Sequence, residues 1–288
     1  MDYTSLNNFF KLGKGHLKKG PIALIFAEDE KELASTIIHH AKLGFAKIII
    51  FSKFIPALPT SVENKIVSVH VDLFHSSGVS FILNKINDLA QNQWIYFCYN
   101  AEYLFYPFCE TRSVTELLDF HSQERRQAML TFVVDLYPND LSSPKRANST
   151  ENVHLDGTGY FALARLDPST HQPLDRQLDY FGGLRWRFEE YVPFNQRKIN
   201  RVSIFESSKG LRISADYTFD DQEYNTYACP WHSNLTAAVV SLRAAKALMT
   251  NPDSKAEIED LSWQHSIPFE WRSTQLLNLG LIEPGQWF

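Results

Sequence analysis

The sequence predicts an α/β protein with a doubly wound, mainly parallel sheet and helices on both faces. Two observations predict this class. Short apolar runs of strand length alternate with helical, amphipathic runs through the first half of the chain. The apolar runs also lack the polar alternation of a half-exposed strand, and strands of that kind are typically buried on both faces by covering helices.

The predicted strands of the first half are residues 21–27, 46–53, 65–71 and 94–99. Helices are predicted between them over residues 28–44 and 80–92, and Gly44 ends the first of these helices. A further helix over residues 113–129 leads into a strand over 130–138, which is rich in β-branched and aromatic residues. Strand and helix therefore alternate as far as residue 138.

The second half has a different character. Residues 139–159 form a long polar stretch, and loops of this length inside a domain are usually functional or disordered. Residues 235–249 predict a strong helix capped by Ser233 or Asn234. The chain divides into an N-terminal arm (1–20), an α/β half (21–140) and a variable half with C-terminal helices (141–288), which we expect to form one globular domain.

Composition excludes several classes of protein. The net charge of −5 argues against a general nucleic-acid binder, and no apolar run is long enough to cross a bilayer. The scattered cysteines Cys98, Cys109 and Cys229 have no paired spacing, which argues against a disulfide scaffold and a structural zinc site. We expect a cytoplasmic protein without a transmembrane segment, for which peripheral contact with a membrane is left open.

Polar residues follow three of the predicted strands. Since ligands of open α/β sheets bind beyond the carboxyl ends of the strands, these residues should face one crevice. They are Glu28, Asp29, Glu30, Ser52, Asn100 and Glu102. Simpler explanations compete with this one, because acidic residues favour the first turn of a helix and a strand end must be polar somewhere.

Well-known phosphate-binding and nucleophile motifs are absent. No G-x-G-x-x-G or G-x-x-x-x-G-K-[ST] follows the first strand, which disfavours a dinucleotide-binding domain and a P-loop enzyme. No G-x-S-x-G is present either, so a serine hydrolase has no support.

The order of motifs over residues 21–140 resembles family-2-type glycosyltransferases of the GT-A fold, in particular the bacterial group related to family 92. Such proteins have a "K-N-E"-like turn after the first strand, then "H-H-x-x-x-G" before the second. This chain has "AEDE" followed by "HHAKLGF", with His39, His40 and Gly44. A later "D-x-D-E-F" in those proteins is matched by "YNAEYLFYP", with Asn100 and Glu102 at the places of the two acids.

The resemblance implies a site for a nucleotide-sugar donor. In that family the D-x-D carboxylates hold a divalent cation, Mn²⁺ or Mg²⁺, which neutralises the departing diphosphate. Here Asn100 and Glu102 would take that place, and His232 would be a late additional ligand, against the simpler interpretation of a turn histidine. Arg185 and Arg187 could bind a diphosphate or an acidic acceptor, or serve only as exposed solubilising groups. His40, on the buried side of an early helix, is expected to be structural.

The function that follows is transfer of a sugar from a nucleotide-sugar donor to a cell-envelope or exopolysaccharide acceptor, a glycan or a lipid-linked one. A catalytic base is not singled out by the sequence, and the candidates are Asp156, Asp179, Glu189 and Glu190. The alternative is a catalytically inactive GT-A-like protein that binds nucleotide sugar or glycan, or acts as an assembly partner. A third hypothesis is an unrelated α/β enzyme that binds magnesium through Glu28, Asp29 and Glu30.

Overall fold

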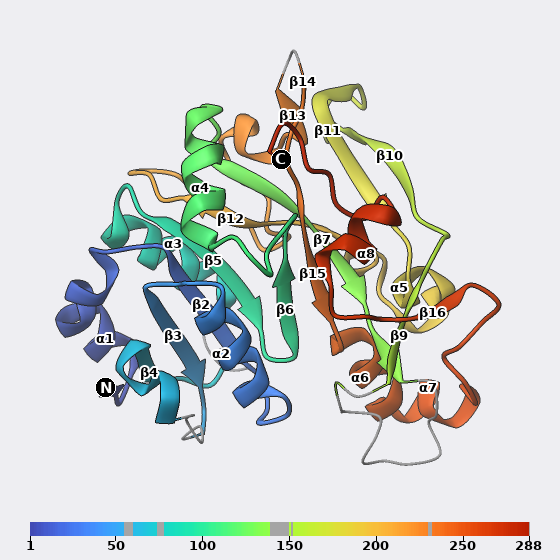
Figure 1. The fold of residues 1–288 in the computed structure, drawn as a ribbon, viewed down its shortest axis with the longest axis horizontal. Coiled ribbons are helices and arrows are strands. Elements are labelled where there is room, and N and C mark those ends of the chain that lie inside the picture. Colours follow the sequence, from blue (N-terminus) through green and yellow to red (C-terminus); the bar gives the residue numbers. More distant parts are fainter. Residues whose placement is uncertain (55–59, 74–77, 139–149, 151, 230–231, 288) are drawn as a thin grey trace. The chain divides into compact units, whose positions relative to one another are not determined.

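A computed structural model describes the chain apart from residues 55–59, 74–77, 139–149, 151, 230–231 and 288 (Figure 1). The protein has an α/β fold whose main sheet holds nine strands in the order β1-β4-β3-β2-β5-β12-β7-β15-β6. The sheet is mixed and mostly parallel, because β12 runs antiparallel to β5 whereas β1 to β5 and the pair β7–β15 are parallel. Two compact units make up the chain, and each is described by itself below.

The first unit contains residues 1–103, 109–130 and 202–225. Its strands are β1 (Asp2–Tyr3), β2 (Ile22–Ala27), β3 (Lys47–Ser52), β4 (Ile66–His70), β5 (Trp94–Tyr99) and most of β12 (Asn200–Glu206). Its helices are α1 (Leu6–Leu12), α2 (Leu33–Lys42), α3 (Val79–Ala90) and α4 (Val114–Gln123), with 3-10 turns at Gly13–Leu17, Thr60–Lys65 and Gln222–Asn225. The chain leaves this unit after residue 130 and returns to it at residues 202–225.

The predicted parallel strands of the first half are confirmed. Strand β2 pairs in parallel with β3 and with β5, and β3 pairs in parallel with β4. All six residues of β2 are buried, in keeping with a central strand covered on both faces. The crossovers from β2 to β3 and from β4 to β5 run in opposite directions along the sheet. Because such crossovers are right-handed, α2 and α3 cover opposite faces.

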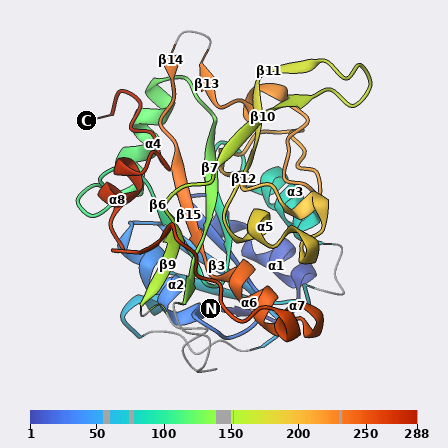
Figure 2. The ribbon, with the colours of Figure 1, turned by 90° about the vertical axis from the view of Figure 1, so that its right-hand side faces the viewer.

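The second unit contains residues 104–108, 131–201 and 226–288. Its strands are the second half of β6 (Glu102–Phe105) and most of β7 (Ala128–Asp135), then β8 (Tyr137–Pro138), β9 (Val153–Asp156), β10 (Phe161–Leu166), β11 (Pro173–Phe181), β13 (Ala228–Cys229), β14 (His232–Ser233), β15 (Ala237–Ser241) and β16 (Ser266–Pro268). Its helices are α5 (Leu184–Arg187), α6 (Arg243–Thr250), α7 (Pro252–Glu257) and α8 (Ser273–Asn278), with 3-10 turns at Glu189–Tyr191 and Phe194–Gln196. Strands β8, β9 and β16 form a small antiparallel sheet, and Figure 2 shows β10 and β11 as a long two-stranded hairpin.

One predicted helix is wrong. Residues 237–241 form the buried strand β15, which pairs in parallel with β7, and helix α6 begins only at Arg243. The predicted cap is also used otherwise, since the side-chain oxygen of Asn234 accepts a hydrogen bond of 3.2 Å from the backbone of Cys229. Val239 and Val240 pack within the sheet, so tertiary burial overrides the helix propensity of the neighbouring alanines.

None of the helices in the described parts of the chain has the length and apolar character needed to cross a membrane.

Candidate functional site

The carboxyl ends of β2 and β5 meet at a reversal of strand order in the first unit. From β2 the chain runs to β3 and β4 on one side, and then returns to β5 on the other side of β2. Such a reversal is the position at which open α/β sheets bind ligands, because the loops leave the two neighbouring strands in opposite directions. The residues that follow these two strands, Glu28 and Asn100, lie at this switch point.

Asn100 fastens the loop that follows β2. Its side chain is fully buried, and its Oδ1 accepts a hydrogen bond of 3.0 Å from the backbone nitrogen of Glu28. Its Nδ2 donates to Oδ1 of Asp29 at 2.7 Å and to the backbone oxygen of Lys31 at 2.9 Å. An asparagine suits this place because it can donate and accept at once, which a carboxylate cannot do.

Glu102 stabilises the turn between β5 and β6. Its side chain is fully buried, and its Oε2 accepts a hydrogen bond of 2.9 Å from the backbone nitrogen of Tyr99. Ala101 lies in the left-handed region with a φ of 62°, and its nitrogen donates to Oγ1 of Thr36 at 2.9 Å. The carboxylate is therefore directed back onto its own turn.

Asn100 and Glu102 do not fit the divalent-cation site that the resemblance implies. Asn100 bonds to the backbone of Glu28 and Lys31 and to the Asp29 carboxylate, Glu102 bonds to the backbone of its own turn, and both side chains are inaccessible in this structure. Among the residues that the structure describes, no three Asp, Glu, His or Cys side chains form a group able to hold a metal ion. His232 belongs to the second unit, where its backbone pairs with that of Cys229 in the β13–β14 ladder, and its side chain is not described.

Acidic groups remain accessible at the switch point. Glu28 and Asp29 are partly exposed and Glu30 is exposed, whereas Ser52, at the end of β3, is buried. The Ser52 hydroxyl donates to the backbone oxygen of Phe54 at 2.7 Å. This edge of the sheet therefore presents carboxylate oxygens, which are acceptors for ligand hydroxyl groups.

His40 lies in α2 and contacts Thr36, the residue that accepts the hydrogen bond from Ala101. The expectation that His40 is buried is confirmed. Its Nδ1 lies 2.7 Å from the backbone oxygen of Thr36, and its Nε2 lies 3.2 Å from the hydroxyl of Tyr96. Burial, with the neighbouring His39 as a smaller cause, lowers the pKa of His40 to about 3. The imidazole is thus neutral at physiological pH and acts in packing and hydrogen bonding.

In the second unit, Asp156 is the centre of a buried polar cluster. Its carboxylate accepts from the Tyr137 hydroxyl, from Nε1 of Trp263 at 2.8 Å, and from Nε and Nη2 of Arg187 at 2.9 and 3.1 Å. The Arg187 guanidinium also lies over the rings of Tyr137 and Trp263. With four donors on its two oxygens, Asp156 has little capacity left to take a proton from a substrate.

Asp135, at the carboxyl end of β7, has a looser environment. Its side chain is inaccessible, and the hydrogen bonds that it accepts from Arg185 are long, 3.3 Å from Nε and 3.4 Å from the backbone nitrogen. Burial raises the pKa of Asp135, and the positive charge of Arg185 opposes that effect. Arg185 thus pairs with a buried carboxylate in this structure, contrary to the interpretation as an exposed solubilising group.

The side chains of Asp135 and Tyr160 pack closely against the backbone of Gly183 and Gly182. A Cβ on Gly183 would lie 3.1 Å from Oδ2 of Asp135, and a Cβ on Gly182 would lie 2.3 Å from the ring of Tyr160. The hydroxyl of Tyr160 is buried and has no hydrogen-bond partner among the described residues. Burial, followed by the charges of Asp156 and Asp135, raises its pKa well above the ordinary value.

The other proposed bases form ion pairs or lie at the surface. Asp179 pairs with Arg165 at 2.9 Å and with Lys198 at 2.7 Å. Glu189 pairs with Arg197 at 2.8 Å, and Glu190 is exposed. Asp135 was missed, although an acid that ends the apolar run "LTFVVD" is the same signal that drew attention to Glu102.

A scan of protein-family models found no match to this chain, and a search of curated proteins found no similar sequence.

Proposed function

We propose that this protein is a GT-A-like glycosyltransferase that binds a nucleotide-sugar donor at the carboxyl ends of β2 and β5. The observation that carries the proposal is the reversal of strand order between β2 and β5, with polar residues following both strands. The resemblance of residues 21–140 to family-2-type enzymes supports the class of donor. The acceptor, a cell-envelope or exopolysaccharide glycan, rests on the resemblance alone.

The charge of this edge fixes how the donor would be oriented. Glu28, Asp29 and Glu30 bring carboxylates to the loop after β2, and carboxylates repel a diphosphate while they accept hydrogen bonds from hydroxyl groups. We therefore place the ribose or sugar hydroxyls against this loop. Asn100 and Glu102 act by holding the two loops in position, so donor binding at this edge does not depend on a metal held by that pair.

A second candidate function is binding of the nucleotide sugar without transfer. It is favoured because side chains proposed for metal binding or catalysis already make hydrogen bonds within the protein. Asn100 bonds to the loop after β2, Glu102 bonds to its own turn, and Asp156 already accepts four hydrogen bonds. Asp135, with its long contacts and raised pKa, is the carboxylate best suited to proton transfer, but it is inaccessible in this structure.

Calorimetric titration and thermal unfolding with UDP-glucose, GDP-mannose, UDP and uridine test the shared claim of donor binding. At a hundredfold excess over Kd, a bound nucleotide sugar should stabilise the fold by about 2.7 kcal/mol. Glu30→Gln should weaken binding. The matched control Glu63→Gln should not, because Glu63 is exposed just before β4, at the amino-end edge of the sheet.

Transfer and binding are separated by following release of UDP from UDP-glucose in the presence of an oligosaccharide acceptor. Release of UDP that requires the acceptor, with donor binding in the same protein, would support the enzyme. Donor binding without release would support the second candidate. If no sugar nucleotide binds, with or without Mn²⁺, both proposals are incorrect.

A further inference from the structure

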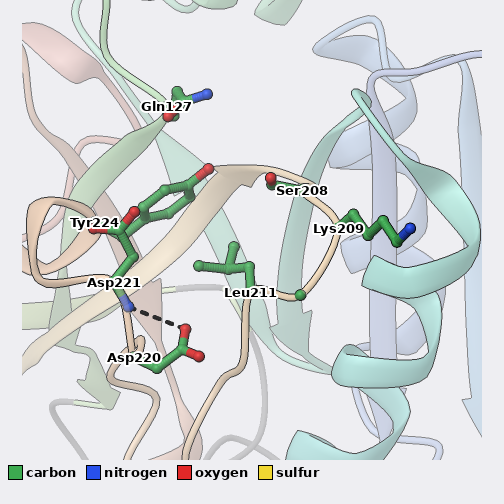
Figure 3. A pocket seen from close by; sticks show the side chains of 8 residues that line it. Gln127, Ser208, Lys209, Leu211, Asp220, Asp221 and Tyr224 are labelled. Carbon is green, nitrogen blue, oxygen red and sulfur yellow. Dashed lines mark hydrogen bonds between the residues drawn. The ribbon is translucent and has the colours of Figure 1, made fainter.

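A polar hollow of ≈ 360 Å³ lies in the first unit, apart from the switch point. It is bordered by the loop after β12, by the turn around Asp220 and Tyr224, and by Gln127 (Figure 3). Ser207 exchanges backbone hydrogen bonds with Asn92 and Gln93 at the start of β5, of 2.8 and 2.9 Å. The hollow therefore adjoins the amino end of β5, whereas Asn100 lies at its carboxyl end.

The walls of the hollow are held by internal hydrogen bonds. Asn87, in α3, donates from Nδ2 to the backbone oxygens of Ser208 at 2.8 Å and Leu211 at 3.0 Å, and its Oδ1 accepts from the nitrogen of Ser208 at 3.0 Å. On the other side, Oδ1 of Asp220 accepts from the backbone nitrogen of Arg212 at 2.8 Å. A site held in this way needs little ordering when a ligand binds.

The chemistry of the lining is that of a site for hydroxyl-rich molecules. Leu211 and Tyr224 border the hollow but are buried, exposed by only 6% and 4%, so the surface that a ligand would meet is mainly polar. The Gln127 amide, the Ser208 hydroxyl and the Asp220 carboxylate lie around Leu211 (Figure 3). A lining of amide, hydroxyl and carboxylate groups offers donors and acceptors to the ring of hydroxyls that a pyranose carries.

Size and charge agree with a neutral ligand. The volume falls within the range of roughly 300–1,000 Å³ that is usual for small-molecule sites. Asp220 and Asp221 oppose an anion, and the side chain of Lys209 is directed away from the centre of the group in Figure 3. Phosphates and acidic sugars are therefore poor candidates.

We propose that this hollow binds one neutral saccharide unit, at a site separate from the donor site at the ends of β2 and β5. The inference does not depend on the proposed function, since it concerns free saccharide in the absence of nucleotide.

Saturation-transfer NMR and titration with methyl α-glucoside, methyl α-galactoside, methyl α-mannoside and maltose test the inference. Ser208→Tyr should fill the hollow and abolish binding while keeping the backbone hydrogen bonds of residue 208 to Asn87. Gln127→Ala should weaken binding about tenfold, the equivalent of one hydrogen bond. Ser214→Tyr and Gln123→Ala, which place the same changes at exposed positions of the first unit, are the controls and should bind as the unmodified protein does.

Thermal unfolding of each variant shows whether it is folded. No binding of any of the four saccharides at tens of millimolar would overturn the inference. Equal binding by the unmodified protein and by a folded Ser208→Tyr variant would do so as well, because the saccharide would then bind elsewhere. Preferential binding of glucose 6-phosphate or of spermidine would replace the neutral saccharide by a charged ligand, and would contradict the argument from charge.

Discussion

The side-chain nitrogen of Asn100 donates a hydrogen bond of 2.7 Å to the carboxylate of Asp29, across the switch point between β5 and β2. The same nitrogen donates to the backbone oxygen of Lys31, so both of its neighbours are acceptors. A second carboxylate at position 100 would place like charges in contact and leave the oxygen of Lys31 without this donor. This contact explains an amide at a place where the resemblance to family-2-type enzymes expects an acid.

We predict that Asn100→Asp destabilises the protein by about 1–3 kcal/mol, because it replaces two buried donor contacts by repulsion. Urea unfolding at neutral pH measures the change, with Asn64→Asp, at an exposed position, as the control. Unchanged stability of Asn100→Asp would contradict the prediction. Stabilisation of Asn100→Asp by Mn²⁺, beyond any effect on the unmodified protein, would instead revive a metal site formed with Glu102.

The stability of the protein should decrease as the pH falls below about 6.5, in part because of His40. Burial lowers the pKa of its folded state to about 3, from an ordinary value of 6.5. The folded state thus favours neutral imidazole, whose contribution is complete above pH 6.5 and is lost as the pH falls toward about 3. Within that window each such histidine changes the unfolding free energy by up to about 1.4 kcal/mol per pH unit.

His40→Gln should therefore reduce the slope of unfolding free energy against pH between pH 6 and pH 4.5. Urea unfolding at several pH values measures this slope. His70→Gln is the control, because His70 is exposed at the end of β4. Equal slopes for the unmodified protein and His40→Gln would show that His40 titrates normally in the folded state.

The Gly183 backbone lies at φ 66° and ψ −158°, a conformation that is essentially restricted to glycine. We predict that Gly183→Ala costs about 2–3 kcal/mol from strain together with the approach of its Cβ to Asp135. Gly210→Ala is the comparison, since Gly210 has a φ of 89° but open space around its Cβ position. Chemical denaturation of both variants, and of Gly183→Ala in an Asp135→Ala background, isolates the contact with Asp135. Equal losses at positions 183 and 210 would exclude a role for that contact.

Sequence patterns predicted the parallel strands of the first half well, because β2, β3 and β5 are continuous apolar runs that are buried in the sheet. They failed at residues 237–241, where alanines favour a helix but pairing with β7 decides the structure. For the candidate site, the polar residues after the apolar runs predicted a position at the carboxyl ends of β2 and β5. It could not show that the polar atoms of Asn100 and Glu102 bind backbone groups, which depends on loops brought together by the fold. No local sequence pattern predicts that residues 202–225 belong to the first unit, or that they line a hollow there.

Two aspartates with arginine partners give the last prediction, because they differ in burial and in the hydrogen bonds that they accept. Asp156 is 1% exposed and pairs with Arg187, whereas Asp175 is 85% exposed and pairs with Arg176. Asp156→Asn should cost about 3 kcal/mol, since it leaves the partly buried guanidinium of Arg187 without its counter-charge. Asp175→Asn should change the unfolding free energy by less than about 0.5 kcal/mol. Urea unfolding of both variants measures the difference. If Asp156→Asn were as stable as the unmodified protein and had lost only sugar transfer, Asp156 would be a catalytic base, and its four hydrogen bonds would have to be exchangeable for those of a substrate.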